Sequence, residues 1–327
     1  MRAVVLDSYG GPEVLTLREV PDPVPGPEEL LVEVAATAVN RADLLQRMGL
    51  YPGPSMTHEI PGLEFAGTVA AVGERVDPGR VGEQVMGIVG GGAYAERLVV
   101  HERQVMPVPA AVGLPAAGAV PEVFITAYDA LVLQGGLTAG GWALVHAGAS
   151  GVGTAAIQLA HAVGARVAVT CSAGKVAACH ELGADVVVDR DEQDFVEVLA
   201  GATAGTGVDV VLDTVGGDYV ARNVAVAAVG GRILQVGVMG GGRAEVPAGE
   251  LLRKRVQWIG TVLRGRPLEG KIAVTQRCAH DLVPLFETGV LRPVIDSSYA
   301  LDEVAAAHEY VGADRNVGKV LLRVATV

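Results

Sequence analysis

A turn of small residues follows a short apolar run near the middle of the chain. Residues 143–145 read as a buried strand, and residues 154–163 have helical composition and spacing. Between them lie Gly148, Gly151 and Gly153, whose missing side chains let a phosphate group come close to the backbone. A helix that starts at such a turn offers free N–H groups and the positive end of its dipole. The stretch predicts an anion-binding turn, although its spacing is not a strict G-x-G-x-x-G.

Strand-like and helix-like stretches alternate after this turn. Further apolar runs of strand length occupy residues 166–170, 185–188, 209–213, 232–236 and 256–261, and helix-like stretches occupy 175–182, 193–199 and 219–229. Six strands linked in this way predict an α/β fold with a doubly wound, mostly parallel sheet of the Rossmann type. Such sheets bind ligands at the carboxyl ends of their strands, so the glycine turn is expected to bind a dinucleotide.

The residues after the second strand indicate which dinucleotide is bound. An NAD site usually has an Asp or Glu about 20 residues past the glycine turn, where it holds the ribose hydroxyls. No carboxylate lies there in this chain, which has Ser172 and Lys175 instead, and Arg190 follows the third strand. A hydroxyl and cations suit a 2′-phosphate. We therefore expect NADPH, with the alternative that Lys175 only faces solvent.

Composition excludes several classes of protein. Half of the 327 residues are hydrophobic and 19% are charged, which argues against disorder. A net charge of −12 without a basic run makes nucleic acid an unsuitable partner. No apolar run is long enough to span a bilayer, and we expect a cytoplasmic protein. Cys171, Cys179 and Cys278 form neither a disulfide framework nor a metal motif.

The segments on either side of this unit have a different character. Residues 1–120 are rich in Pro and Gly and contain short strand-like runs at 30–38, 67–72 and 94–100, which indicates a β-rich domain. After the sixth strand we expect a helix over 268–288, extended pieces at 292–295 and 298–301, a helix over 301–312 capped by Asp302, and a strand over 319–324. The simplest arrangement joins residues 1–121 and 263–327 into one domain, interrupted by a Rossmann domain over 122–262. The active site is then expected between the two domains.

Several motifs resemble the zinc-independent quinone oxidoreductases of the medium-chain dehydrogenase/reductase superfamily. The resemblance covers nearly the whole chain, and its anchors are residues 40–52, 61–67, 126–131, 146–153 and 316–320. The runs 263–266 and 238–242 are most similar to the tumour-suppressor-inducible branch of that family. This resemblance implies that the β-rich segments form a GroES-like catalytic domain.

Departures from the zinc-dependent relatives bear on the metal. Asn40 stands where those alcohol dehydrogenases have a zinc-ligating Cys, and Leu63 replaces the His of their Gly-His-Glu turn. The four-Cys lobe that precedes their Rossmann domain is missing, because no Cys occurs before Cys171. Catalytic zinc needs three protein ligands and structural zinc needs four. The sequence therefore predicts no metal site.

Without a metal to polarise it, the hydride acceptor must already be electrophilic, which favours a quinone or a conjugated enone. By resemblance Tyr51 and Asn40 lie at the nicotinamide end of the site and are the candidate catalytic residues. Tyr51 either donates a proton or only positions the cofactor. Asp43 and Glu64 are interpreted as structural partners of backbone or Arg. Further cofactor contacts are expected at Thr126, Gly148, Ser150, Gly151, Val152, Ser172, Lys175, Arg190, Val238, Met239 and Asn316.

The leading hypothesis is an NADPH-dependent quinone oxidoreductase. An NADPH-dependent alkenal or enone reductase shares the fold and the metal-free site, and a non-enzymatic, crystallin-like NADPH-binding protein is the alternative from another class. We also expect a homodimer. Residues 256–261 form an apolar strand that carries Trp258 and lies at the sheet edge in the Rossmann order, where it can pair with its own copy. The alternative is that a loop such as 263–267 covers this edge within one chain.

Overall fold

Two units, each with its own sheets, make up the chain in the computed structural model. Unit 1 comprises Met1–Ile125 and Arg264–Val327, and unit 2 comprises Thr126–Leu263. The structure describes residues 1–51, 53–54 and 57–324. The division lies a few residues from the expected boundaries at 121/122 and 262/263.

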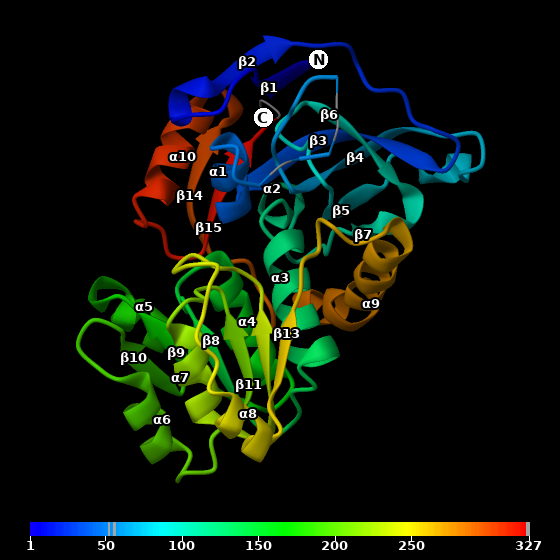
Figure 1. Ribbon diagram of the computed structural model, residues 1–327. Coiled ribbons are helices and arrows are strands. Elements are labelled where there is room, and N and C mark those ends of the chain that lie inside the picture. The colour runs from blue at the N-terminus through cyan, green and yellow to red at the C-terminus, as the bar shows by residue number, and fades with distance from the viewer. Residues whose placement is uncertain (52, 55–56, 325–327) are drawn as a thin grey trace. The chain divides into compact units, whose positions relative to one another are not determined.

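Unit 2 is built on a six-stranded parallel sheet (Figure 1). Its strands are β8 (Trp142–His146), β9 (Arg166–Cys171), β10 (Val186–Asp189), β11 (Val208–Asp213), β12 (Ala227–Gln235) and β13 (Gln257–Gly260). They lie in the order β10-β9-β8-β11-β12-β13, with every neighbouring pair parallel. This is the doubly wound Rossmann order, in which the first strand lies at the centre and the last at an edge.

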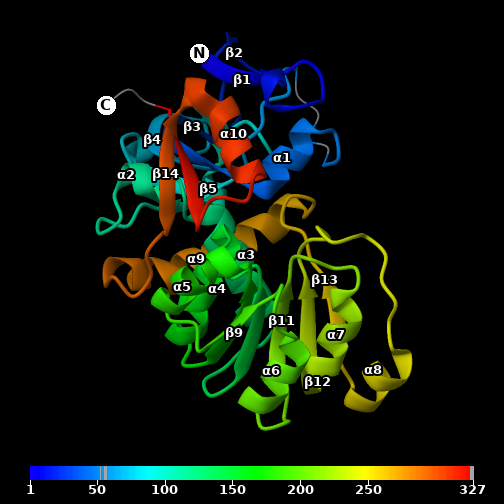
Figure 2. The same cartoon turned by 90° about the vertical axis from the view of Figure 1, so that its left-hand side faces the viewer.

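Helices connect these strands and cover the sheet. They are α4 (Gly151–Ala162), α5 (Val176–Glu181), α6 (Phe195–Ala202), α7 (Tyr219–Val226) and α8 (Ala248–Lys254), with a 3₁₀ turn η5 (Ala173–Lys175) and a π-helical turn η4 (Asp129–Gln134). Apolar residues of α6, α7 and α8 pack into one core with the sheet (Figure 2). This burial of one apolar face per helix provides most of the stability of such short helices.

The helix expected over 219–229 is shorter than predicted. It ends at Val226 because Ala227 takes an extended conformation and pairs with Val208 of β11. Residues 227–229 therefore belong to β12, and the strand pairing overrides the helical composition of this short stretch.

Unit 1 is β-rich, as expected for a GroES-like domain. Its strands are β1 (Arg2–Leu6), β2 (Leu15–Glu19), β3 (Glu29–Val39), β4 (Glu64–Val72), β5 (Gln84–Ile88), β6 (Arg97–His101), β7 (Val105–Pro107), β14 (Ile295–Ala300) and β15 (Lys319–Arg323). Seven of them form a sheet in the order β14-β15-β3-β4-β5-β7, with β6 paired to β3, while β1 and β2 form a hairpin of their own. The two segments of unit 1 meet where β15 pairs antiparallel with β3.

Four short helices and the 20-residue helix α9 complete the described part of unit 1. They are α1 (Arg41–Arg47), α2 (Leu114–Ala117), α3 (Pro121–Tyr128, which runs on into unit 2), α9 (Leu268–Glu287) and α10 (Val304–Gly312), with 3₁₀ turns η1 (Pro12–Val14), η2 (Pro78–Arg80), η3 (Glu102–Gln104) and η6 (Leu301–Glu303). The expected cap at Asp302 is wrong, because Asp302 lies inside η6 and the carboxylate of Glu303 instead accepts from the Ala300 N–H at 2.8 Å. Within the described residues, no helix combines the length and apolar character needed to cross a bilayer.

Candidate functional site

The β8–α4 turn is shaped by close backbone contacts. A Cβ atom on Gly148 would lie 2.5 Å from Cβ of Val169, and one on Gly153 would lie 2.4 Å from the Ala147 carbonyl oxygen. Both distances are too short for any residue but glycine. The hydroxyl of Ser150 accepts from the Gly153 N–H at 3.0 Å and caps α4. The glycines thus lie between a strand and a capped helix, which is the context in which a glycine motif indicates a phosphate-binding turn.

The parallel sheet brings the expected cofactor contacts of unit 2 to one edge. Ser150, Gly151 and Val152 follow β8, whereas Val238 and Met239 follow β12. Carboxyl ends of parallel strands share an edge, so these segments lie on the same side of the sheet. Val238 and Met239 are 54% and 55% exposed, which leaves two apolar side chains open to a ligand. Thr126, another expected contact, is half-buried within α3 and does not cap its start.

The residues after β9 and β10 suit a phosphate. Ser172 and Lys175 bound the turn η5, and a Cβ on Gly174 between them would meet nothing within 4 Å. The Arg190 N–H donates to the Cys171 carbonyl at 2.9 Å, which brings Arg190 next to the end of β9. The Arg190 guanidinium is exposed and lies 3.7 Å from the Asp191 carboxylate. A hydroxyl and two cations therefore fit a 2′-phosphate better than a ribose hydroxyl.

A buried polar network links residues at the carboxyl ends of β8, β9 and β11. His146 lies between Thr170 Oγ1, 3.0 Å from its Nδ1, and Asn223 Oδ1, 2.8 Å from its Nε2. The Asn223 amide donates to Asp213 Oδ2 at 2.9 Å, and Asp213 Oδ1 accepts from the backbone N–H groups of residues 215 and 216. Burial lowers the pKa of His146, although the Asp213 charge opposes this. The network ties three strand ends to the loop after β11, a role that the sequence did not reveal.

In unit 1, Asn40 belongs to a buried ion-pair cluster. Lys319 Nζ lies 2.7 Å from Glu64 Oε1 and donates to Asn40 Oδ1 at 2.6 Å. The Asn40 amide donates to Glu64 Oε1 at 2.9 Å and to the Ala38 carbonyl at 3.2 Å. Glu64 is 0% and Lys319 3% exposed, so each charge depends on the other for stabilisation. Both N–H groups of the Asn40 side-chain amide thus donate hydrogen bonds within the protein. This favours a role in holding the Glu64–Lys319 pair over donation to a substrate.

The charged partner of Glu64 is thus a lysine and not an Arg, while its other carboxylate oxygen accepts from a backbone N–H, that of Glu122, as expected. Lys319 stood within one of the resemblance motifs, residues 316–320, but nothing in its spacing connected it to Glu64. The turn before Lys319 is held by Asn316, whose amide donates to the Gly318 carbonyl at 2.7 Å. Gly318 has φ of +81°, a conformation that favours glycine. Asn316 therefore shapes the turn that delivers Lys319 to the cluster.

A second buried chain of polar groups runs from Asn40 towards α10. Asp43 Oδ2 accepts from the Asn40 N–H at 2.8 Å and from the Tyr94 hydroxyl at 3.0 Å. The same hydroxyl lies 3.1 Å from Nε2 of His308. Burial raises the pKa of Asp43 to about 6 and lowers that of His308 to about 3, so His308 is neutral. Asp43 thus has backbone and tyrosine partners, as a structural carboxylate would.

Glu122 is a carboxyl group that sequence reasoning missed. Its N–H donates to Glu64 Oε2 at 2.9 Å, which attaches the start of α3 to the ion-pair cluster. Burial, and then the negative charge of Glu64, raise the pKa of Glu122 to about 8. This group is mostly protonated at neutral pH and can hold a proton that ordinary carboxylates have lost.

Tyr51 lies against a guanidinium group. The Arg264 Cζ atom is 4.8 Å from the centre of the Tyr51 ring, and Arg264 Nη1 donates to the Tyr51 carbonyl at 3.1 Å. Burial raises the pKa of Tyr51, Glu122 adds to this, and Arg264 opposes it. Tyr51 therefore keeps its phenolic proton at neutral pH, as either expected role requires.

Among the described residues, no group of three or more His, Cys, Asp or Glu side chains is placed to hold a metal ion. In unit 1, Asn40 belongs to the cluster with Glu64 and Lys319, in which the Lys319 ammonium neutralises the Glu64 carboxylate. A cation already fills the electrostatic role that a metal would have beside Glu64.

Comparison with known proteins agrees with this architecture. Residues 26–110 match the alcohol dehydrogenase GroES-like domain family, and residues 151–277 match the zinc-binding dehydrogenase family. The rat synaptic vesicle membrane protein VAT-1 homolog is 32% identical over 98% of this chain and 84% of its own length. Human quinone oxidoreductase is 30% identical over 98% of this chain and 97% of its own length.

The chain belongs to the medium-chain dehydrogenase/reductase superfamily.

Solved structures of the superfamily superpose over nearly the whole chain. Escherichia coli quinone oxidoreductase complexed with NADPH has a TM-score of 0.90 at 29% identity and covers 99% of this chain and 100% of its own. JamJ enoyl reductase has a TM-score of 0.89 at 26% identity and covers 98% of each chain. Quinone oxidoreductases and enoyl reductases of the superfamily are thus both similar to this chain.

Proposed function

We propose that this chain is an NADPH-dependent quinone oxidoreductase that works without zinc. The observation that carries the proposal is the buried cluster of Asn40, Glu64 and Lys319, in which polar groups satisfy each other. By the sequence resemblance, Asn40 stands where zinc-dependent relatives have a metal-ligating Cys. A site of this kind has no Lewis acid to activate an alcohol or an unconjugated ketone. Its acceptor must accept a hydride readily, as a quinone does.

NADPH is proposed as the cofactor on the chemistry of unit 2. The glycine turn before α4 would receive the pyrophosphate, and Ser172, Lys175 and Arg190 would receive the 2′-phosphate. The E. coli relative complexed with NADPH supports this choice. Bound NADPH would supply a hydride, and one proton from solvent or a side chain would complete a hydroquinone. Tyr51 is proposed to line the acceptor site, and Asn40 to hold Lys319 and Glu64 in place.

A steady-state assay tests the proposal. NADPH oxidation is followed with a panel of quinones and, on the same preparation, a panel of conjugated enones and alkenals. Turnover with quinones at least about tenfold higher in kcat/KM than with every enone is expected, a difference of about 1.4 kcal/mol in transition-state stabilisation. Elemental analysis that found about one zinc per chain, with activity lost on its removal, would contradict the metal-free site.

The second candidate is an NADPH-dependent alkenal or enone reductase. It is favoured by the similarity to JamJ enoyl reductase and would be indicated by the reverse preference in the same assay. Residues 51–58 are proposed to help shape the acceptor site, and residues 52, 55 and 56 among them lie outside the described residues. NADPH binding without oxidation by either panel would indicate the third alternative, a crystallin-like binding protein. A cytoplasmic location remains a prediction.

A further inference from the structure

The Arg264 side chain makes several contacts within unit 1 that the proposed activity does not explain. It lies at the start of the second segment of unit 1, between β13 and α9. Its Nε donates to the Gly90 carbonyl at 2.7 Å, its Nη1 to the Tyr51 carbonyl at 3.1 Å, and its Nη2 to Gln46 Oε1 at 2.7 Å. All three nitrogens of the guanidinium are therefore bonded, each to a different segment of the chain.

The three acceptors belong to three different segments of unit 1. Gln46 is on α1, Tyr51 follows it in the loop, and Gly90 belongs to the glycine-rich turn after β5. The Gln46 amide also donates to Glu59 Oε1 at 3.0 Å, so Glu59 is linked to Arg264 through Gln46. A planar guanidinium presents its donors on separate nitrogens in fixed directions, whereas an ammonium group presents all three of its donors from one atom, so the two cannot hold the same set of acceptors in the same way.

Arg264 also fixes the ring of Tyr51. With Cζ 4.8 Å from the ring centre, the guanidinium lies within cation–π range, while its Nη1 holds the carbonyl of the same residue. Two contacts to one residue restrict both its backbone and its side chain. Arg264 is half-buried, so solvent screens these contacts less than it would at the surface.

We propose that Arg264 is a positioning residue that holds Tyr51 at the acceptor site and thereby determines how well acceptors bind. The inference rests on the proposed function, in which Tyr51 lines that site. Arg264 acts through Tyr51 and does not touch the reacting atoms. Loss of the fork would leave Tyr51 free to turn away, and acceptor binding would weaken while cofactor binding persists.

A double-mutant cycle tests this inference. Arg264→Met is expected to lower kcat/KM for the acceptor about tenfold, mostly through KM, and to change the KM for NADPH less than about twofold. In a Tyr51→Ala background the same substitution should change acceptor kcat/KM less than about twofold, because its target is gone. Equal effects in both backgrounds would overturn the proposal, since they would indicate a general structural role or direct contact with the acceptor.

Matched variants separate charge from geometry. Arg264→Lys keeps the charge but not the fork and is expected to behave like Arg264→Met; wild-type kinetics for it would overturn a role for the fork. Arg103→Met removes another arginine of unit 1, one that pairs with exposed Glu269 through two bonds of 3.1 Å, and should leave acceptor kinetics unchanged. A similar loss in Arg103→Met would show that the effect is not specific to Arg264.

A measurement without turnover keeps the inference distinct from the proposed function. Tetranitromethane nitrates accessible tyrosine rings. Nitration of Tyr51, followed by mass spectrometry of its peptide, is expected to be at least about tenfold faster in Arg264→Met than in the wild type and Arg103→Met, since loss of the guanidinium releases and exposes the ring. If the wild-type protein turned over neither quinones nor enones, the proposed function would fail while this comparison still decided whether Arg264 holds Tyr51. Unchanged nitration of Tyr51 would overturn the inference.

Discussion

Lys175 is the residue at which cofactor choice can be tested most directly. It closes the turn after β9, where the chain has no carboxylate to bind ribose hydroxyls. A charge-assisted bond to a 2′-phosphate contributes about 1.5–3 kcal/mol. Lys175→Ala is therefore expected to weaken NADPH binding about tenfold or more and to leave NADH binding nearly unchanged, as measured by calorimetry.

Lys254→Ala is a suitable control for Lys175→Ala, because Lys254 bonds backbone carbonyls of residues 224, 225 and 227 away from the carboxyl edge. It should leave the ratio of NADPH to NADH affinity as it is. Wild-type protein that bound NADH as tightly as NADPH would contradict the assignment of the site after β9.

Glu122 makes stability depend on pH. Its pKa of about 8 in the folded chain lies above the ordinary value of 4.5, so the folded state binds the proton more tightly than the unfolded state does. The free energy of unfolding then falls as pH rises through the range from about 4.5 to about 8, and stays low above it. Asp43, with a pKa of about 6, acts in the same direction.

Glu122→Gln keeps the shape of the protonated acid and cannot ionise. The variant is expected to be more stable than the wild type by about 1–3 kcal/mol at about pH 9, and to differ little at about pH 5. Urea unfolding at both pH values measures this difference. The exposed Glu245→Gln variant is the control and should shift neither midpoint. A Glu122→Gln variant with the pH dependence of the wild type would refute the raised pKa.

At the scale of elements, the β8–α4 connection should tolerate no added atom. A Cβ on Gly153 would lie 2.4 Å from two carbonyl oxygens of the turn, whereas a Cβ on Gly201 in α6 would meet nothing within 4 Å. Gly153→Ala is therefore expected to lower stability by about 1–3 kcal/mol and to abolish measurable NADPH binding. Gly201→Ala should lower neither, and thermal unfolding with a cofactor titration compares the two. Equal behaviour of both variants would contradict the tight turn.

The elements of unit 2 could be predicted from the sequence because each is encoded locally. Short apolar runs give parallel strands, and the helices between them have their own periodicity, so the order of the six strands followed from the Rossmann rule. The predicted helix was wrong at residues 227–229, because pairing with β11 makes them part of a strand although their composition is helical. Local signals cannot report a pairing partner that lies elsewhere in the chain.

Unit 1 shows the same limit more strongly. Its β-rich character was predicted, but the pairing of β15 with β3 joins residues about 280 positions apart, and no local pattern encodes it. The cluster of Lys319 with Glu64 depends on that long-range pairing, and the contact of Arg264 with Tyr51 likewise joins residues far apart in the sequence. Individual site residues could be proposed by resemblance, whereas their partners required the fold.

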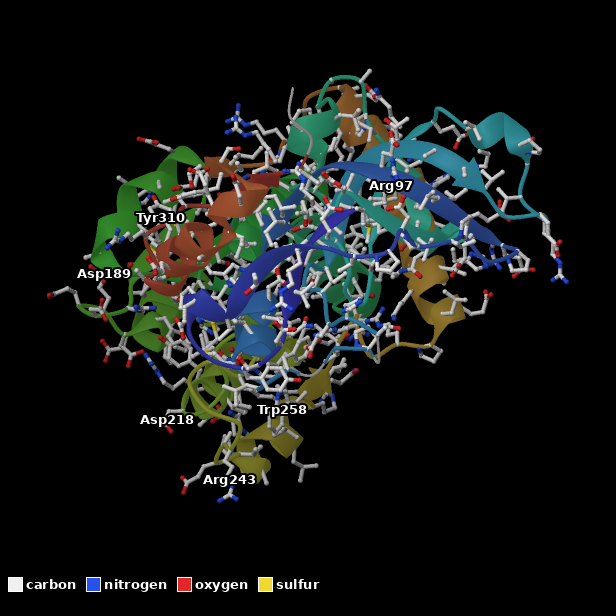
Figure 3. The ribbon with its side chains drawn as sticks, turned by 90° about the horizontal axis from the view of Figure 1, so that it is seen from above. Arg97, Asp189, Asp218, Arg243, Trp258 and Tyr310 are labelled. Atoms are coloured by element: carbon white, nitrogen blue, oxygen red, sulfur yellow. The ribbon has the colours of Figure 1, made fainter. Side chains whose placement is uncertain are left out.

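For the whole molecule, the edge strand β13 is the feature that bears on assembly. Among the described residues it pairs with β12 alone. Trp258, which lies on this strand and is labelled in Figure 3, is 43% exposed. An open, partly apolar edge is a hazard for aggregation, and pairing with a second copy across a two-fold axis removes it. We therefore expect a homodimer in which the sheets of two copies of unit 2 join through this strand.

The direction of the backbone groups determines the best test of this dimer. The Thr261 N–H donates to the Gln235 carbonyl of β12 at 3.0 Å. Because alternate N–H groups of a strand point to opposite sides, the N–H of Ile259 also faces β12, and that of Trp258 faces the open edge. Ile259→Pro would thus damage the chain's own sheet, whereas Trp258→Pro removes a donor from the open edge.

At micromolar concentration, light scattering of the wild type should give twice the 33.5 kDa chain mass. Trp258→Pro should lower this mass towards that of one chain, while Leu252→Ala, which removes a 76% exposed side chain on α8, should not. A monomeric wild type across a dilution series would refute pairing at this edge.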